Sequence, residues 1–284
     1  MNFSKILTYK NHTRTIFKPI IDLKLKTIKN EFDKNSNVII TLTSYSERLN
    51  DIKYTLYSLF SQNLKPQKIV LYLEYGTKIP ETLSIFVENG LNIEFCEDIG
   101  SYTKLIPALK KYANYVLVTA DDDIYYPSDW LEKLYNSYQK TPSEIHCHRA
   151  HLISFNNNEP LPYEKWEKHI SNVKSSYKNF LTGVGGVLYP PNCFSNEIFN
   201  QTKFLTLAPH ADDIWFWAMA ILNNRKICVV DNNIKNLKVT NILRQLNFKG
   251  LKTLYAQNKN GGNDKQLLAI LKEYPEIKNM LMSD

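Results

Sequence analysis

Three consecutive carboxylates, Asp121, Asp122 and Asp123, directly follow the apolar run at residues 115–120. The run predicts a buried central strand. Neighbouring carboxylates repel one another, and burying one without a partner is costly, so a strand that ends in three of them is expected to meet a cation. Divalent ions such as Mg²⁺ prefer carboxylate oxygens and keep positions open for phosphate oxygens. The alternative is an exposed acidic turn in which Asp123 or Ser128 caps the next helix.

A second acidic pair, Asp212 and Asp213, precedes a run at 214–222 that is apolar nearly all round and predicts a buried helix. Backbone N–H groups and the helix dipole favour a charged carboxylate at such a helix start. A helix cap accounts for one aspartate, and we expect one of the pair to be a cap. It does not account for two aspartates with His210 before them. The other aspartate is therefore a candidate general base.

Two basic residues follow predicted strand ends and are candidate phosphate partners, Arg48 in the loop at 44–48 and Lys104 in the loop at 100–104. A metal-bound diphosphate leaves negative charge that such residues can offset. An ordinary surface salt bridge is the alternative for each.

Two further motifs are more ambiguous. His146 and His148 share one face of a predicted strand and favour core or substrate contacts over a metal site. Gly183, Gly185 and Gly186 allow either a close backbone approach to a ligand or a tight turn.

The order of elements predicts an α/β fold, a Rossmann-like and mostly parallel sheet flanked by helices. We expect strands at 37–43, 69–73, 92–95, 115–119, 145–150 and 227–230, and helices near 52–60, 81–88, 103–112, 130–138, after 212–213 and at 262–273. Residues 155–180 read as a loop-like insertion that covers a substrate. Neither GxGxxG nor GxxxxGK[ST] is present, which argues against a dinucleotide fingerprint and a P-loop.

Composition indicates a globular protein: of 284 residues, 43% are apolar and 22% charged. Four scattered cysteines without a CxxC pair argue against a zinc ribbon or a disulfide framework and fit a reducing compartment. No signal peptide and no apolar run near membrane-spanning length is present, so we expect a cytoplasmic protein.

The net charge of +7 is uneven, with seven basic residues before position 31 against the single acid Asp22, and a second group of lysines from 249 to 278. Such patches suit an anionic surface, including a peripheral contact with the inner face of the cytoplasmic membrane, or are solvated helix faces. No nucleic-acid-binding module is present. We expect a basic extension at 1–35, a catalytic domain at 36–240 with halves 36–125 and 126–240, and a helical segment at 241–284.

Together these motifs resemble the nucleotide-sugar-dependent glycosyltransferases of the GT-A fold, in particular the family 2-like bacterial enzymes of capsule and lipooligosaccharide synthesis. The matching segments cover most of residues 37–225: they are 38–45 with Arg48, 58–62, 101–105, 119–123, 182–190 and 211–215.

For the donor side, the resemblance implies that Asp121 and Asp123 hold Mn²⁺ or Mg²⁺ on the diphosphate of a nucleotide-sugar, with Asp122 beside it. The residues implied around the nucleoside are Thr41, Thr43, Tyr45 and Arg48, with Lys104 near the diphosphate. Glu74 is the nearest match to an acidic contact with the base, although the family's Asp-Asp-Gly-Ser is missing here. A uridine nucleotide is the family's expectation.

For the acceptor side, the family's late acidic pair maps onto Asp212 and Asp213, with the second residue as the base. The acceptor is implied to be a glycan or a lipid-linked glycan. No Gln-x-x-Arg-Trp is present, which favours single hexosyl addition with inversion over polymerisation.

Three rival functions stay open. A phosphatase of the haloacid dehalogenase type also uses a strand-end Asp-x-Asp, but on its first strand and with Thr or Val where Tyr125 stands here. A nucleotidyltransferase would share the sheet and the metal. The third alternative is a binding scaffold without catalysis.

Overall fold

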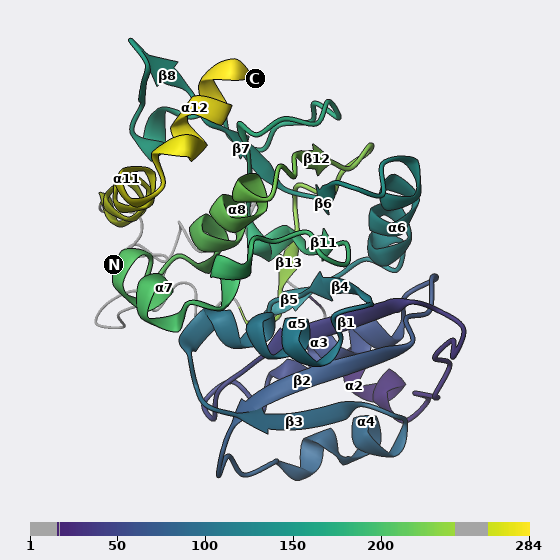
Figure 1. Cartoon of the computed structure of the whole chain (residues 1–284). Coiled ribbons are helices and arrows are strands. Elements are labelled where there is room, and N and C mark those ends of the chain that lie inside the picture. Colours follow the sequence, from purple (N-terminus) through teal and green to yellow (C-terminus); the bar gives the residue numbers. More distant parts are fainter. Residues whose placement is uncertain (1–15, 17, 242–260) are drawn as a thin grey trace, which may run out of the picture.

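A mixed seven-stranded sheet is the centre of the computed structural model, which describes residues 16, 18–241 and 261–284. The spatial order is β12-β6-β11-β4-β1-β2-β3, which follows the labels from top to bottom in Figure 1. The strands are β1 (Val38–Thr43), β2 (Lys68–Glu74), β3 (Asn92–Cys96), β4 (Val116–Thr119), β6 (Ile145–Cys147), β11 (Val187–Tyr189) and β12 (Ile227–Val229).

One strand of the sheet runs against the others. β1 is parallel to β2 and β4, β2 to β3, and β6 to β12, whereas β11 is antiparallel to both β4 and β6. β6 is antiparallel to β11, and β11 is antiparallel to β4, so β6 points the same way as β4. The start of β11 therefore lies at the same edge as the carboxyl ends of the other six strands. The predicted α/β fold with a mostly parallel sheet is confirmed.

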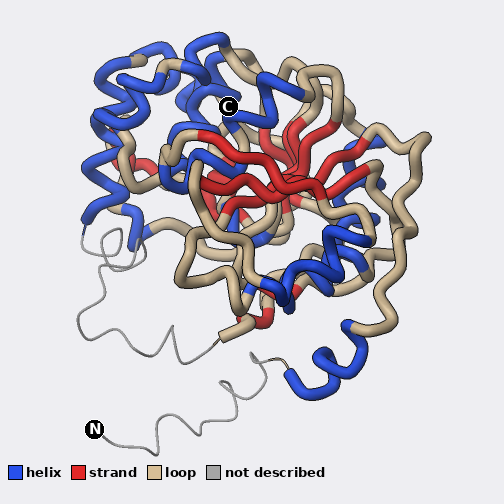
Figure 2. Tube along the Cα trace, turned by 90° about the horizontal axis from the view of Figure 1, so that it is seen from below, coloured by secondary structure: helices blue, strands red, loops and turns tan. Residues whose placement is uncertain are grey.

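Helices cover both faces of the sheet, as the end-on view in Figure 2 shows. One face packs against α3 (Ile52–Phe60), α4 (Ser84–Glu88) and α6 (Trp130–Lys140). The other face packs against α5 (Ile106–Lys111), α7 (Gln201–Leu207), α8 (Asp212–Leu222), α11 (Asn263–Glu273) and α12 (Pro275–Ser283). Each face of the sheet thus has its own apolar core.

Helix α8 is buried nearly all round, as its apolar sequence predicts. Its outer side is covered by α11 and α12, which place Leu267, Ile270, Ile277 and Leu281 in the same core. The sequence pattern did not identify α12, which begins at Pro275, or α7. Proline at the first helical position is favourable because its missing N–H would have no partner there.

Several predicted elements are subdivided. The helix expected at 103–112 is a 3₁₀ turn, η3 (Gly100–Lys104), followed by α5, and the helix at 81–88 starts with η2 (Glu81–Leu83) before α4. The strand expected at 145–150 splits into β6 and β7 (Ala150–Leu152). The insertion at 155–180 contains more structure than predicted: β8 (Phe155–Asn156), β9 (Glu159–Pro160), η4 (Tyr163–Lys165) and the start of β10 (Asn179–Leu181), which pairs with β7.

The amino-terminal helix α2 (Lys18–Leu25) packs on α3 through Ile21 and two ion pairs. Lys18 Nζ lies 3.3 Å from Asp51 Oδ1, and Lys53 Nζ lies 2.8 Å from Asp22 Oδ1. Other basic residues of the predicted charged termini lie outside the described residues: Lys5, Lys10, Arg14, Lys249, Lys252 and Lys259. Within the described ranges, no helix has the length and hydropathy needed to cross a membrane.

Candidate active site

Lys104 joins the two acidic groups. Its Nζ lies 2.8 Å from Asp121 Oδ1 and 3.2 Å from Asp212 Oδ2, so aspartates 91 positions apart in the sequence meet at one ammonium. Burial works against its charge, but the attraction of Asp121, then of Asp212 and Asp213, raises the pKa of Lys104 well above its usual value. The two acidic groups therefore meet at one site in the folded protein.

The position of Lys104 depends on the aromatic packing of η3. The Tyr102 ring stacks on Phe204 with centroids 4.2 Å apart, and its hydroxyl donates to the Ala208 carbonyl at 2.6 Å. These contacts fasten the turn before Lys104 to the segment that leads into α8.

Asp213 is held by a backbone amide. Both of its carboxylate oxygens accept from the Gly183 N–H, each at 3.0 Å. A Cβ on residue 183 would lie 2.8 Å from Asp213 Oδ1 and 3.5 Å from Lys104 Nζ, so only glycine lets the carboxylate approach this closely. Burial, and next the charge of Asp212, raise the pKa of Asp213 to about 7. A group with this pKa can accept and release protons near neutral pH.

The cap prediction for this pair is wrong. The residue at the N-cap of α8 is Ala211, and Asp212 and Asp213 are the first two residues of the helix, without a side-chain capping bond. Their carboxylates turn instead toward Lys104 and Gly183. Burial also outweighs the expected effect of the helix start on Asp213, because its pKa is raised rather than lowered.

The three aspartates after β4 turn to different partners. Asp121 pairs with Lys104, while the buried Asp122 accepts from Ser44 Oγ at 2.6 Å and from Arg48 Nη1 at 2.6 Å. Asp123 Oδ2 lies 3.1 Å from the same Arg48 nitrogen. Burial, followed by the charge of Asp122, raises the pKa of Asp123 to about 6 despite Arg48. Asp123 is thus a carboxylate with less compensation than its neighbour.

Arg48 is the cation on the donor side of the predicted site. Its Nε donates to the Tyr45 hydroxyl at 3.0 Å, and its guanidinium lies 5.2 Å from the centre of the Tyr45 ring. Burial opposes its charge, yet Asp122 and Asp123 raise the pKa of Arg48 above its usual value. A small polar pocket is lined by Arg48, Asp51, Asp122, Asp123, Thr240 and Asn241.

Ser44, Asp51, Thr240 and Asn241 were missing from the predicted site. Ser44 could have been predicted from the sequence, since it starts the same loop as Arg48. Thr240 had no local signal: it reaches the site because β13 (Lys238–Val239) pairs with β5 (Ile124–Tyr125), which lets its N–H donate to the Asp123 carbonyl at 2.8 Å.

The other predicted donor contacts lie near the same strand ends. Thr41 is fully buried, and among the described residues its hydroxyl has no hydrogen-bond partner. Thr43 Oγ1 donates to the Tyr72 carbonyl at 3.0 Å, and Tyr45 is 53% exposed. Glu74 is exposed at the carboxyl end of β2. Their roles toward a nucleoside stay predictions.

The two histidines of β6 and its carboxyl end belong to the core, as favoured from the sequence. His146 contacts Ser137 Oγ at 2.9 Å, and His148 contacts the Trp130 carbonyl at 2.9 Å. Burial lowers the pKa of each to about 4, so both are neutral at pH 7. At the nearby glycine bend, Gly186 has φ +84°, and a Cβ there would lie 2.3 Å from the Trp130 ring.

The carboxylates of this site could bind a divalent ion only if a second molecule, such as a substrate diphosphate, supplied further oxygen ligands. In the described part of the chain, no three His, Cys, Asp or Glu side chains converge as metal ligands. Mg²⁺ at nucleotide sites is held by one or two carboxylates together with substrate phosphates. Burial and the neighbouring charges of Asp122 and Asp121 outweigh Arg48 in raising the pKa of Asp123, so Asp123, with Asp121 nearby, fits this second arrangement and not an all-protein cage.

Comparison with known proteins gives structural likeness only. No family model and no curated protein matches the chain. Among solved structures it is similar to a CMP:2-keto-3-deoxy-manno-octonic acid synthetase complexed with CTP, at 10% identity and a TM-score of 0.44 over 74% of this chain and 97% of the other.

It is also similar to S. aureus TarS 1–349 in complex with UDP, at 16% identity and a TM-score of 0.45 over 69% of this chain and 58% of TarS 1–349. The complex of the same protein with UDP-GlcNAc has 17% identity and a TM-score of 0.44, over 69% of this chain and 56% of that one. Likeness at this level does not carry an activity from one protein to another.

Proposed function

We propose that this protein is a metal-dependent, inverting glycosyltransferase that moves a hexosyl group from a UDP-sugar to a hydroxyl of a bacterial surface glycan. The observation that supports this most is the bridge through Lys104, which puts a diphosphate-compatible cation beside a base. Asp212 is buried against Lys104, whereas Asp213 is half-buried and has the pKa of a base that works near pH 7.

In the proposed reaction, ionised Asp213 accepts the proton of the acceptor hydroxyl. The hydroxyl oxygen forms a bond to the anomeric carbon of the donor from the side opposite the diphosphate. The bond from that carbon to the phosphate oxygen breaks, and the nucleoside diphosphate leaves with the electron pair. Lys104 and Arg48 lie at the strand ends where they would offset the charge of the leaving group.

Asp123, with Asp121, would hold Mn²⁺ or Mg²⁺ together with the diphosphate oxygens. When bound, the ion would add positive charge next to the leaving group. Arg48 pairs with Asp122 and Asp123 and would keep these carboxylates in place for the ion.

The acceptor proposed here is a glycan or lipid-linked glycan of capsule or lipooligosaccharide type, met at the inner face of the cytoplasmic membrane. Helix α2 supports a peripheral contact, because Ile20 is 50% exposed and Leu23 is 75% exposed next to Lys24 and Lys26. Apolar side chains among lysines suit the interface of an anionic membrane.

A panel of nucleotide-sugars with Mn²⁺ and a mixture of glycan acceptors tests the proposal by product analysis. We expect release of UDP and a glycosylated product that needs both substrates. Pyrophosphate as a product would instead identify a nucleotidyltransferase, and inorganic phosphate from simple phosphoesters a phosphatase. If no nucleotide-sugar shifts the melting temperature, the result favours the third rival, a binding scaffold without catalysis.

A further inference from the structure

The strand order places a second basic residue beside the proposed base. Because β6 runs parallel to β4, Arg149 follows the carboxyl end of β6 at the same edge where Asp121 follows β4. A Cβ on Gly185 would lie 2.8 Å from the Arg149 Cβ, so the Arg149 stem packs directly on the turn at 183–185. Lys104 and Asp213 contact the same turn at Gly183.

Arg149 belongs to a group of four nitrogen-bearing side chains that we call the Arg149 cluster: Arg149, His151, Lys168 and His169. Arg149 Nε donates to the ring nitrogen Nδ1 of His169 at 3.0 Å. The backbone N–H of His169 donates to His151 Nδ1 at 3.1 Å. His169 has φ +55°, which is uncommon for a residue other than glycine, and its ring accepts the Arg149 hydrogen bond. The guanidinium is therefore oriented before any ligand arrives.

Arg149 and Lys168 are the two cations of the cluster, and the carboxylates of Asp264 and Glu164 act on Lys168 from nearby. Within the described residues, the Lys168 ammonium donates to the Tyr163 carbonyl and lies 3.3 Å from the centre of that ring, and it forms no ion pair with a carboxylate. Burial mainly, and Arg149 in addition, lower the pKa of Lys168 to about 8, although Asp264 and Glu164 act in the other direction. Residues 242–260 contain no Asp or Glu, so that stretch of sequence supplies no carboxylate either.

We propose that the Arg149 cluster binds an anionic group of the acceptor, a sugar carboxylate or a phosphate, at the Gly185 end of the turn whose Gly183 end lies near Lys104. This inference rests on the proposed function, because it assigns the substrate that Asp213 deprotonates. The donor diphosphate already has Lys104 and Arg48 on its own side. A neutral acceptor would not need two cations held in a partly buried position, where their charge is costly.

Binding of simple sugars by isothermal titration calorimetry tests the inference without any nucleotide. We expect glucose 6-phosphate and glucuronate to bind the full-length protein in the millimolar range and glucose not to bind. Arg149→Met and Lys168→Met keep the apolar stem of each side chain and remove its charge. Each should weaken binding of the anionic sugars by about tenfold, the typical value for a charge-assisted hydrogen bond.

Two variants serve as controls. Lys165→Met removes an exposed charge from the same loop and should change the affinity less than about twofold. Arg48→Met removes the donor-side cation and should leave this binding unchanged. If Arg149→Met fails to fold, as judged by circular dichroism, Lys168→Met carries the test.

The inference is wrong if glucose binds as tightly as glucose 6-phosphate, or if Arg48→Met abolishes binding while Arg149→Met and Lys168→Met do not. The relative affinities for glucuronate and glucose 6-phosphate decide between a carboxylate and a phosphate. The nucleotide-sugar panel is scored separately, so loss of the proposed transferase function is distinguishable from loss of this anion site.

Discussion

The two acidic groups of the site follow the same arrangement with different outcomes. In each, one aspartate is paired with a cation and leaves its neighbour under-compensated: Asp122 bonds Arg48 beside Asp123, and Asp212 meets Lys104 beside Asp213. The pKa of the neighbour is raised in both cases, to about 6 for Asp123 and to about 7 for Asp213. Burial is the main cause of both shifts, and the neighbouring negative charge adds to it.

The difference lies in what surrounds the under-compensated carboxylate. Asp123 lines a small polar pocket with Arg48, Thr240 and Asn241, where a cation and phosphate oxygens suit the chemistry. Asp213 faces a backbone N–H and has Lys104 as its nearest cation. We infer that the first group is adapted to bind a metal ion and the second to bind a proton. The following predictions test this contrast, from the largest expected effect to the smallest.

Asp213→Asn should have the largest effect, because it removes the proton acceptor and keeps the shape. We expect the transfer rate, measured as kcat, to fall about 10³-fold with little change in donor affinity. Asp231→Asn, at an exposed position two residues after β12, is the matched control and should keep full activity. Near-normal transfer by a folded Asp213→Asn protein would require another base.

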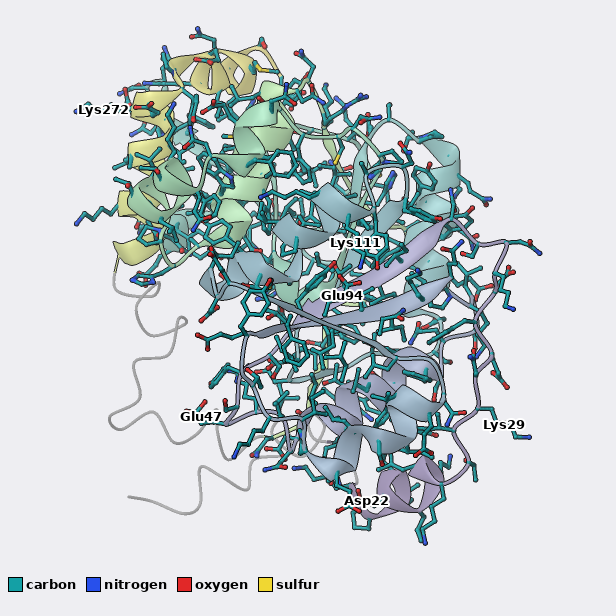
Figure 3. All side chains as sticks on the ribbon, turned by 60° about the horizontal axis from the view of Figure 1, so that its bottom comes forward. Asp22, Lys29, Glu47, Glu94, Lys111 and Lys272 are labelled. Carbon is teal, nitrogen blue, oxygen red and sulfur yellow. The ribbon has the colours of Figure 1, made fainter. Side chains whose placement is uncertain are left out.

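Lys104→Met should destabilise the fold most, because it leaves the buried Asp212 and the half-buried Asp121 without their shared cation. We expect the free energy of unfolding in urea to fall by about 3 kcal/mol. Lys111→Met is the comparison: Figure 3 shows Lys111 and Glu94 side by side, 2.8 Å apart, but with the lysine 57% exposed. Loss of such an exposed pair should cost less than about 1 kcal/mol. Equal losses in the two variants would contradict the central role of Lys104.

Asp122→Asn and Asp123→Asn should separate the structural from the metal-binding carboxylate. Asp122→Asn weakens the buried bonds to Arg48 and Ser44, and we expect it to cost about 2 kcal/mol of unfolding free energy. Asp123→Asn should cost less, but should abolish the rise in melting temperature that Mn²⁺ with UDP gives the wild type. The reverse pattern would exchange the two roles.

The pH dependence of stability should show the raised pKa of Asp213. Its usual value of 3.8 is raised to about 7 in the folded protein, so the folded state binds more protons than the unfolded state between these values. The contribution of this group is therefore fully present below about pH 4 and is lost as the pH rises through 7. Relative to their difference at pH 4, Asp213→Asn should gain up to about 4 kcal/mol of stability over the wild type at pH 8, because a shift of one pKa unit corresponds to about 1.4 kcal/mol. Parallel stability curves for the two proteins would contradict the raised pKa.

The sequence predicted the half of the fold at 36–125 better than the half at 126–240. Strands β1 to β4 alternate with helices, and their apolar runs and turn residues are local signals. The direction of β11 has no such signal, because three buried residues pair equally well either way and only its neighbours decide. The same holds for Thr240, which reaches Asp123 through the pairing of β13 with β5, where Tyr125 and Lys238 are 113 positions apart in the sequence.

Most of the candidate site residues could be predicted from the sequence, but the side chains that they contact could not. Lys104, Asp121, Asp212 and Asp213 stood out by type and position. That Lys104 bridges the two groups depends on the packing of Tyr102 on Phe204, which no local pattern encodes. Arg149 was equally inconspicuous, because its place beside the turn at 183–185 follows from the order of β4, β11 and β6.

The shared ammonium of Lys104 makes the two halves of the site thermodynamically linked. Without a bound donor, the Lys104 ammonium helps to keep Asp213 ionised, since its positive charge opposes the rise in the pKa of Asp213. A diphosphate that attracts Lys104 would weaken this effect, so the proton affinity of Asp213 would increase when the donor binds. Reciprocity then requires that the donor bind more tightly as Asp213 becomes protonated. Catalysis on such a site would favour an order in which the donor arrives first and strengthens the base that the acceptor meets.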